Sequence, residues 1–370
     1  MKKSSAAKID RTTPNREEMI ERVATLVPSL AERAEQVEKT RTIHPDTVQE
    51  FWDTQLWSIM KPKRYGGLEL DYAMLVDIPD YIARGCASTS WIYANLVIHD
   101  WMLAMWPSEA QDVVWKNNPR ALMASSLIPN AGRATPVAGG YRIAGRWPYC
   151  SGIDISDWMM MAAMTQDDQS QRPIWFVVPR SEFEEIDTWH VSGLIGTGSR
   201  DVRCEDVFVP ECMTLNPRMA RGGPTPGAPH NPALVYQLPV LGLFPHLLVG
   251  PMVGIAQGAY DDYGREARER VSTYNASKLS EHTQTQMKVA EAGALIQAAR
   301  LLAHDNIREA ERIAESGRQP TVEEKVRWRR DGAFAAQNCI KSIQILHSTI
   351  GAAGNYLSHP FQRRFRDMHA

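Results

Sequence analysis

The chain has 370 residues, which is long enough to bury a large core and to form two or three packed units. Its 41 lysines and arginines nearly balance 43 aspartates and glutamates, so a formal net charge of -2 gives no sign of a nucleic-acid or membrane-surface partner. Five cysteines without a CxxC pair or histidines at zinc spacing argue against a metal site or a secreted disulfide framework, and favour a reducing cytoplasm.

The first third of the chain is predicted to be helical. Its N-terminus is basic but lacks the apolar core of a signal peptide, and no later run approaches the ~20 apolar residues of a membrane helix. Asn15 is a suitable helix cap, and Pro28 is expected to divide the first helix. The predicted helices are separated by turns such as KPKRYGG and cover residues 15–38, 44–60, 72–83 and 88–105.

From residue 121 the periodicity changes to short β-rich runs separated by turn residues. Such spacing is typical of a small antiparallel barrel or sandwich. A Pro- and Gly-rich segment, residues 221–229, then marks a boundary. The predicted strands are residues 121–127, 141–147, 158–164, 174–178, 183–191 and 203–209.

Long helical segments are predicted after this boundary, at residues 239–275, 283–316 and 321–350. Small residues recur at residues 250–259 and would allow close helix approach. A few helices of such length indicate an up-and-down bundle, and apolar residues on several faces indicate packing against neighbouring subunits. We predict four parts: an N-terminal helical domain, a central β-domain, a linker and a C-terminal helical bundle, at residues 1–120, 121–220, 221–232 and 233–370.

Three stretches carry more information than the periodicity. Residues 139–158 contain GRWPYCSG, in which two β-type runs flank a tight polar turn, and residues 193–202 contain GTGSRDV. Residues 351–367 contain GAAG followed by HPFQRRFRD. In this order the stretches resemble the acyl-CoA dehydrogenase superfamily. The first two resemble its branch of flavin-dependent monooxygenases, typified by the oxygenase components of hydroxyphenylacetate and secosteroid-phenol hydroxylases.

The resemblance covers nearly the whole chain and implies an α+β, mainly α fold. It comprises an N-terminal helical domain, a central antiparallel β-barrel or sandwich and a C-terminal helical bundle, assembled as a homotetramer. Many acyl-CoA dehydrogenases carry a catalytic glutamate where this chain has Ser358, and a serine without an activating neighbour cannot replace that base. The departure argues against dehydrogenation. An acyl-CoA dehydrogenase or oxidase stays the alternative, because Glu266 or Glu269 could supply a base from another helix.

The monooxygenase branch implies that reduced flavin reacts with O2 to give a C4a-hydroperoxide, which hydroxylates a small phenolic or indolic compound. By this resemblance Ser151 contacts flavin N5 or the peroxide, while the alternative is that Ser151 and Gly152 merely close a turn. Arg270 would reach a flavin phosphate across a subunit interface, with Gln286 and Arg300 as weaker candidates, or would be a solvated helix charge. The implied flavin-binding residues are Ser125, Ser126, Trp147, Tyr149, Ser151, Gly152 and Arg270.

A histidine suits removal of a phenolic proton near neutral pH. The resemblance draws one histidine from the N-terminal helices and one from beyond the R-D motif, where this chain has His99 and His369. The alternative for His99 is a buried core histidine among aromatic residues. His369 precedes Ala370, whereas relatives usually continue for another helix and tail.

No GxGxxG or Walker-type loop is found, so the chain shows no nicotinamide or ATP site. The resemblance implies that a separate NAD(P)H:flavin reductase supplies reduced FMN or FAD by diffusion. Oxidation of nitrogen or sulfur by the same fold, and a flavin-free scaffold, stay open because fold alone does not fix function. We expect a cytoplasmic enzyme without a metal, a nucleic-acid partner or a membrane partner.

Overall fold

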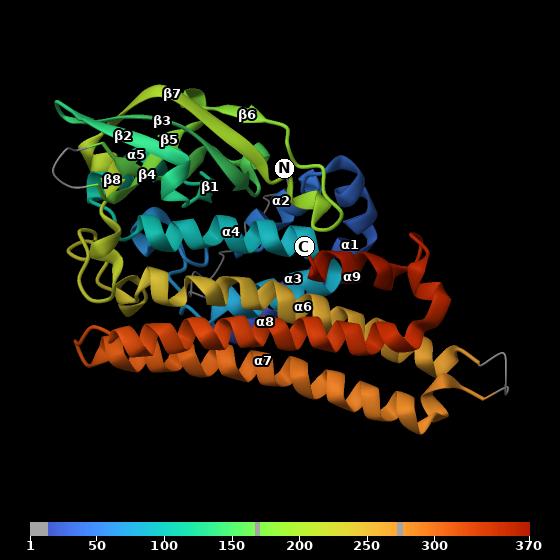
Figure 1. Cartoon of the computed structure of the whole chain (residues 1–370). Helices are drawn as coiled ribbons and strands as arrows, with labels where there is room; N and C mark the ends of the chain where they lie inside the picture. The colour runs from blue at the N-terminus through green and yellow to red at the C-terminus, as the bar shows by residue number, and fades with distance from the viewer. Residues whose placement is uncertain (1–13, 167–170, 272–276) are drawn as a thin grey trace, which may run out of the picture.

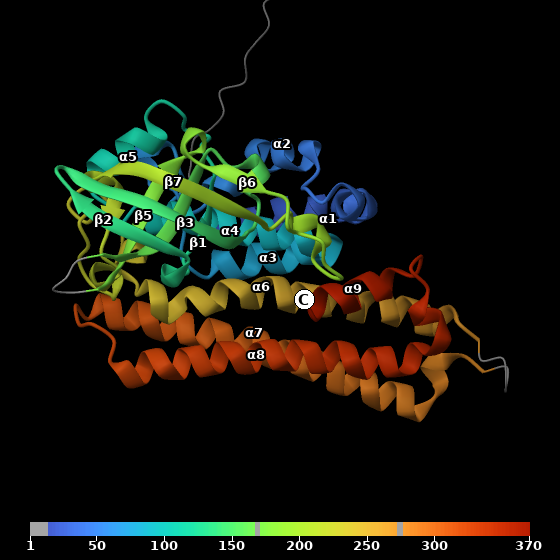
Figure 2. The same ribbon diagram turned by 45° about the horizontal axis from the view of Figure 1, so that its top comes forward.

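The computed structural model describes residues 14–166, 171–271 and 277–370. Figure 1 shows a β-sheet above a layer of helices that includes α4 (Ala87–Leu103), with the long helices α7 (Thr283–Glu315) and α8 (Val322–Ile350) on the far side. α3 (Met74–Gly85) and α6 (Val240–Glu269) lie between α4 and the α7–α8 pair, and the turned view in Figure 2 keeps this order. This arrangement puts α4 directly against the sheet.

The first helix, α1 (Arg16–Thr40), begins at a capping box formed by Asn15 and Glu18. The prediction that Pro28 divides this helix is wrong, since the helix is continuous through it. Buried side chains continue on both sides of Pro28 and pack on α3. This packing outweighs the backbone hydrogen bond that the proline removes.

The next helical segment is shorter than predicted. α2 (Pro45–Asp53) ends where Gln55 adopts a left-handed conformation with φ 63°, which stops a helix. A further helix, α5 (Ser108–Trp115), follows α4 and was not predicted.

The strands form one sheet in the order β6-β7-β3-β2-β4-β5-β8, and β1 pairs with β4 outside this path. The sheet is mixed rather than purely antiparallel as predicted, because β1 and β2 both run parallel to β4. The described strands are β1 (Met123–Ser126), β2 (Gly132–Val137), β3 (Gly140–Cys150), β4 (Trp158–Thr165), β5 (Pro173–Pro179), β6 (Glu184–Ile186), β7 (Arg200–Pro210) and β8 (Thr214–Leu215).

Two differences from the predicted strands matter for the site. Of the predicted strand at residues 183–191 only β6 is formed, and the chain from residue 187 to 199 is a loop. β2 was not predicted, because its burial pattern leaves only Ala134 inside the sheet. Because no strand forms between residues 187 and 199, this loop can turn back towards α4.

The small residues of α6 allow close helix packing, as predicted. A Cβ at Gly250 would lie 2.6 Å from the carbonyl oxygen of Val76, and one at Gly254 would lie 2.1 Å from that of Asp80. Among the described helices, α6 is long and apolar enough to cross a membrane by length and composition, but 67% of its most apolar window is buried, which is typical of a core helix. The short helix α9 (Pro360–Met368) packs on α6 and α8. The predicted division of the chain into four parts stays a prediction.

Candidate functional site

A cavity of about 410 Å³ lies between α4, the turn after β3 and the loop of residues 187–199. Its lining provides two indoles, a phenol, an amide and three hydroxyl groups, and among the described residues no charged side chain lines it. Such walls suit a flat, neutral aromatic guest. The lining residues are Trp91, Asn95, Tyr149, Ser151, Trp189, Leu194, Thr197, Ser199 and Ala370.

The turn after β3 brings Ser151 to the cavity. Tyr149 has φ 64° and is 65% exposed, and the Ser151 N–H donates to its carbonyl oxygen at 3.0 Å. Gly152 has φ 70°, and its N–H donates to the carbonyl oxygen of Thr197 at 3.1 Å. A Cβ at Gly152 would lie 2.9 Å from Cγ2 of Ile92 on α4. Glycine therefore allows both the backbone conformation and the close approach to the helix.

Three buried hydroxyl groups form a chain along one wall of the cavity. The indole N–H of Trp91 donates to Ser151 Oγ at 3.2 Å. Ser151 Oγ lies 2.7 Å from Ser199 Oγ, which lies 2.7 Å from Thr197 Oγ1. The Thr197 hydroxyl donates to the carbonyl oxygen of Leu194 at 2.8 Å. The chain links α4, the β3 turn and the loop by hydrogen bonds.

Helix α9 anchors this loop from outside the cavity. Oδ1 of Asp367 accepts the N–H of Leu194 at 2.8 Å, and Nη1 of Arg366 donates to the carbonyl oxygen of Ser192 at 2.6 Å. Burial is the main cause that raises the pKa of Asp367 to about 6. The backbone of the loop therefore depends on two side chains from the C-terminal end of the chain.

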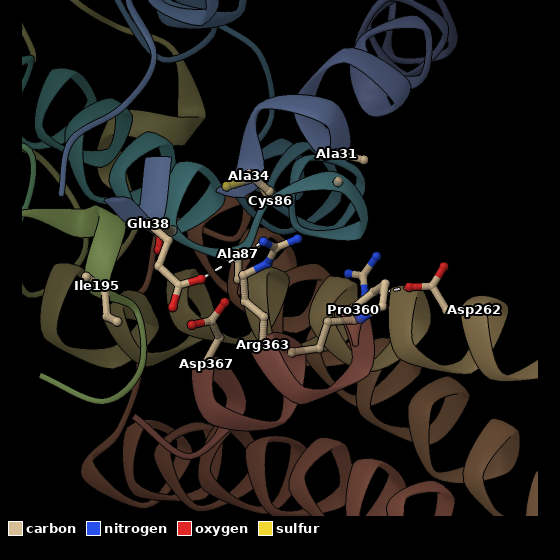
Figure 3. A pocket seen from close by; sticks show the side chains of 13 residues that line it. Ala31, Ala34, Glu38, Cys86, Ala87, Ile195, Asp262, Pro360, Arg363 and Asp367 are labelled. Atoms are coloured by element: carbon tan, nitrogen blue, oxygen red, sulfur yellow. Dashed lines mark hydrogen bonds and ion pairs between the residues drawn. The ribbon is translucent and has the colours of Figure 1, made fainter. Parts of the chain in front are cut away.

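A second cavity, of about 230 Å³, lies beside this anchor, between α1, the start of α4 and α9. Figure 3 shows Glu38, Arg363 and Asp367 grouped at this cavity, with Asp262 at its other end. The guanidinium of Arg363 lies 4.0 Å from the carboxylate of Glu38, and Asp262 accepts from Nε of Arg364 at 2.8 Å. These ion pairs connect α9 to α1 and to α6, so the second cavity lies where three helices pack together.

His99 lies outside the Ser151 cavity, although it follows Asn95 by one helical turn on α4. It is fully buried, and its Nδ1 is hydrogen-bonded to the carbonyl oxygen of Met123 at 2.8 Å, so Nδ1 carries the proton. Burial lowers the pKa of His99 to about 4. The ring is neutral at physiological pH, and its Nε2 has no hydrogen-bond partner among the described residues.

His369 is exposed and does not line the cavity, whereas its neighbour Ala370 does. Its Nδ1 donates to the carbonyl oxygen of Phe365 at 2.7 Å, and its Nε2 lies 3.1 Å from Nε2 of Gln344. The structure thus brings neither predicted histidine to the hydroxyl chain. A role for either as the base stays a prediction.

Of the other predicted flavin contacts, Trp147 is fully buried inside the sheet and donates its indole N–H to the carbonyl oxygen of Ala162 at 2.6 Å. The ring therefore supports the sheet from within, and its contact with the flavin stays a prediction. Ser125 and Ser126 lie at the end of β1, which packs against α4. Oγ of Ser126 is buried without a hydrogen-bond partner among the described residues.

The predicted phosphate contacts have partners inside the chain. Arg270 donates from Nη1 to the carbonyl oxygen of Ile350 at 2.7 Å and thereby caps the C-terminal end of α8. Gln286 donates to the carbonyl oxygen of Ser280 at 3.0 Å. Neither lines the Ser151 cavity.

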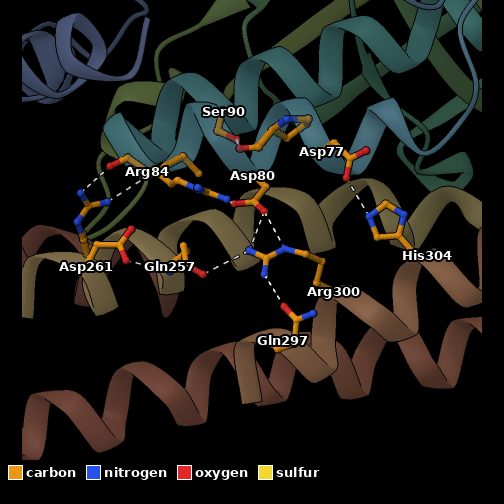
Figure 4. A network of polar contacts seen from close by, with 12 residues as sticks. Asp77, Asp80, Arg84, Ser90, Gln257, Asp261, Gln297, Arg300 and His304 are labelled. Atoms are coloured by element: carbon orange, nitrogen blue, oxygen red, sulfur yellow. Dashed lines mark hydrogen bonds and ion pairs between the residues drawn. The ribbon is translucent and has the colours of Figure 1, made fainter. Parts of the chain in front are cut away.

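Arg300 belongs to a polar network between α3 and the long helices, shown in Figure 4. Its Nε and Nη2 donate to Oδ2 of Asp80 at 3.1 and 2.9 Å, while Arg84 donates to the other oxygen of Asp80 at 3.0 Å. His304 lies 2.9 Å from Asp77 in the same network. Asp80 is almost fully buried, and its contact with Arg300 joins α3 to α7.

The alternative of acyl-CoA dehydrogenation requires a carboxylate base at the ligand cavity. Glu266 instead binds Arg270 at 3.0 Å and His359 at 3.2 Å. Glu269 and Ser358 are exposed. None of them lines the Ser151 cavity, so the described residues place no carboxylate where an α-proton would have to be removed.

The sequence interpretation missed seven of the nine lining residues, although the positions of several of them carry a signal. Trp91 and Asn95 are spaced i, i+4 and therefore share one face of α4. Thr197 and Ser199 lie inside the GTGSRDV motif, where only the motif as a whole was used. Trp189 falls in a segment predicted to be a strand, and no local pattern predicts its return to the cavity.

Comparison with known proteins identifies the family of this chain. The sequence matches the family model "Acyl-CoA dehydrogenase, N-terminal domain" over residues 13–115 and "Acyl-CoA dehydrogenase, C-terminal domain" over residues 246–370. These matches cover more than half of the chain, which belongs to the acyl-CoA dehydrogenase family.

Similar proteins define the branch of this family. The oxygenase subunit HsaA of a flavin-dependent monooxygenase from Rhodococcus jostii is 32% identical over 95% of this chain and 92% of its own length. The oxygenase component of an FADH2-dependent resorcinol hydroxylase from Rhizobium sp. is 33% identical over 95% and 88%. The crystal structure of 3-HSA hydroxylase from Rhodococcus sp. RHA1 superimposes with a TM-score of 0.90 at 32% identity over 95% and 91% of the two chains. The chain is therefore an oxidoreductase of the flavin-dependent monooxygenase type.

The cavity fits the flavin that this branch uses. An isoalloxazine ring is flat and aromatic and has hydrogen-bonding groups along its edge. Trp91, Trp189 and Tyr149 offer aromatic surfaces, and Ser151 adds a hydroxyl oxygen. The unpartnered Oγ of Ser126 is a further buried group that lacks a hydrogen bond. Aromatic walls with a few polar groups are what such a ring requires.

Proposed function

We propose that this chain is the oxygenase component of a two-component flavin-dependent monooxygenase that hydroxylates a small, uncharged phenolic or indolic compound. The neutral aromatic cavity beside Ser151 carries the proposal. Two indoles and a phenol provide contacts for an aromatic ring, whereas a carboxylate on the guest would meet no cationic side chain in the described lining. The name of the Rhizobium relative, a resorcinol hydroxylase, supports an uncharged phenol.

Reduced flavin supplies the electrons and activates O2 when it is bound, so that one oxygen atom enters the substrate and the other leaves as water. The residues of this chain bind and orient the rings and exclude water. Asn95 donates its amide N–H to the carbonyl oxygen of Trp91 at 2.8 Å, which fixes the side chain at the cavity. No described residue donates to Oδ1 of Asn95, so this oxygen is the acceptor that we assign to the substrate O–H or N–H.

The remaining parts of the system follow from this proposal. A separate NAD(P)H:flavin reductase would deliver reduced FMN or FAD, O2 would be the cosubstrate, and the enzyme would act in the cytoplasm, in keeping with five free cysteines. We also propose a homotetramer. Exposed apolar side chains along α7 and α8 support such packing: Met287, Leu301, Val322, Val326 and Phe334.

The test is an anaerobic titration of the protein with reduced FMN and reduced FAD, followed by addition of ¹⁸O2 with resorcinol or indole. We expect saturable binding of one reduced flavin and an aromatic product that has gained one labelled oxygen. Ser151→Ala should lower the yield of product, while Ser181→Ala, which changes an exposed serine outside the cavity, should not. Absence of any oxygenated aromatic product, or bleaching of bound oxidised flavin by an acyl-CoA, would overturn the proposal.

A further inference from the structure

The direction of the hydroxyl chain can be assigned from its last member. A carbonyl oxygen only accepts, so the 2.8 Å contact with Leu194 uses the single hydroxyl proton of Thr197. Thr197 must then accept from Ser199 across their 2.7 Å contact. Ser199 has no second hydroxyl proton and must accept from Ser151 across the other 2.7 Å contact.

The consequence concerns the free face of Ser151. Its proton points to Ser199, away from the cavity, and one of its two lone pairs accepts the indole N–H of Trp91 at 3.2 Å. The group that Ser151 offers to the cavity is therefore its remaining lone pair. A ligand must bring an N–H or O–H to this point, because a second acceptor there would be repelled and left unpaired.

We infer that Thr197 and Ser199 are positioning residues that hold Ser151 as a hydrogen-bond acceptor, so that the cavity selects a ring carrying an N–H or O–H donor. The inference rests on the proposed function and deepens it. Ser199 is 3% exposed and Thr197 is fully buried, so neither side chain is free to exchange its hydrogen bond with water. The two residues act through Ser151 and need not touch the ligand themselves.

Two sources could supply the donor. The isoalloxazine ring carries a hydrogen on N5 only in its reduced form, so an acceptor at Ser151 would favour reduced over oxidised flavin. Alternatively, the donor is the phenolic O–H or indole N–H of the substrate. Both have the same chemistry, an aromatic ring donor, and binding measurements distinguish them.

The experiment compares the wild type with Thr197→Val, Ser199→Ala and the control Thr197→Ser. Valine has the shape of threonine without the hydroxyl, so Ser199 loses its acceptor and can turn its proton to Ser151, whose own proton then faces the cavity. Ser199→Ala removes the acceptor of Ser151 directly. Thr197→Ser keeps the hydroxyl and should behave as the wild type. Thermal unfolding of each variant establishes that it is folded.

Two affinity ratios are measured by anaerobic titration, without turnover. The first compares reduced with oxidised FMN and FAD, and the second compares indole with N-methylindole, which lacks the donor. We expect Thr197→Val and Ser199→Ala to reduce one of these ratios about three- to tenfold, as reversal of one hydrogen bond requires. A change in the first ratio assigns the donor to the flavin, and a change in the second assigns it to the substrate.

Both ratios staying at the wild-type values in Thr197→Val and in Ser199→Ala would overturn the inference while leaving the proposed function intact. An equal loss in the control Thr197→Ser would also overturn it, since the effect would then be one of packing. A wild type that binds neither flavin nor an aromatic compound would overturn the proposed function and the inference together.

Discussion

Replacement of Asp367 by asparagine tests how the cavity loop is held. An asparagine has nearly the shape of aspartate, and its amide oxygen can still accept the N–H of Leu194, which Oδ1 now accepts at 2.8 Å. The change removes only the buried negative charge. Burial raises the pKa of Asp367 from 3.8 to about 6 in spite of Arg366 and Arg363 nearby. The charge therefore costs the folded state free energy at neutral pH.

The size of this cost follows from the difference in pKa. The folded chain holds the proton of Asp367 more tightly than the unfolded chain does, so the contribution to stability is fully present below pH 3.8 and is lost as the pH rises through about 6. A difference of about two pKa units corresponds to about 3 kcal/mol, of which roughly half is lost above pH 5. Asp367→Asn cannot lose this contribution. We expect the variant to gain stability relative to the wild type as the pH rises.

The assay is urea unfolding of both proteins at several values between pH 5 and pH 8. The expected result is a difference in the free energy of unfolding that grows by between one and two kcal/mol, roughly, over this range in favour of Asp367→Asn. Asp367→Ala is the matched control, because it removes the acceptor as well and leaves the Leu194 N–H unpaired at every pH, which costs about 1–3 kcal/mol. Parallel pH dependence of the wild type and Asp367→Asn would refute the reasoning.

Three further predictions concern the helix α4 and its contacts. Gly152→Ala should destabilise the fold by about 1–3 kcal/mol and weaken binding of reduced flavin, because its φ is 70° and its new Cβ would lie 2.9 Å from Ile92; unchanged unfolding and titration curves would contradict this. Since burial lowers the pKa of His99 to about 4, His99→Gln should leave any midpoint between pH 5 and 8 in the turnover profile unchanged, and loss of a midpoint would identify His99 as the titrating base. Lys61→Met should cost about 3–5 kcal/mol in denaturant unfolding, because it leaves Asp100, 3.7 Å from Nζ, as a buried carboxylate without its cationic partner; the double variant with Asp100→Asn should recover most of the loss.

The fold could be predicted from the sequence because its signals are local. The long helices α7 and α8 begin within one residue of the predicted positions, because both have apolar periodicity and α8 also begins at a capping box formed by Thr321 and Glu324. Pro28 shows the limit of such rules, since its effect was overruled by packing of α1 on α3. The parallel pairing of β1 and β2 with β4 was also missed, because strand direction is set by long-range contacts that no local pattern records.

The candidate site was only partly predictable for the same reason. The motif GRWPYCSG identified the turn that holds Ser151, and the structure places Ser151 at the cavity. Trp147 in the same motif is fully buried and donates its indole N–H to the carbonyl oxygen of Ala162, and the register of β3 on β7 shifts between Trp147 and Cys150, so the motif alone does not show which side chains reach the cavity. Asn95 was not predicted, because a single asparagine on an apolar helix does not indicate a ligand contact unless its neighbours in the fold are known. His99 was predicted as a base because of the chemistry of its imidazole. It lies four residues after Asn95 on α4, however, and does not line the cavity.

The cavity depends on contacts between parts of the chain that lie far apart in the sequence. α4 supplies Trp91, the sheet supplies Ser151, and α9 holds Leu194 through Asp367, so the hydroxyl chain exists only when all three are docked. This gives the closing R-D motif a physical role at the ligand cavity. Arg366 and Asp367 do not line the cavity, but they bind the loop backbone at Ser192 and Leu194, on which the orientation of the hydroxyl groups depends. A substitution of Arg366 or Asp367 in α9 should therefore alter ligand binding while it leaves the β-sheet unchanged.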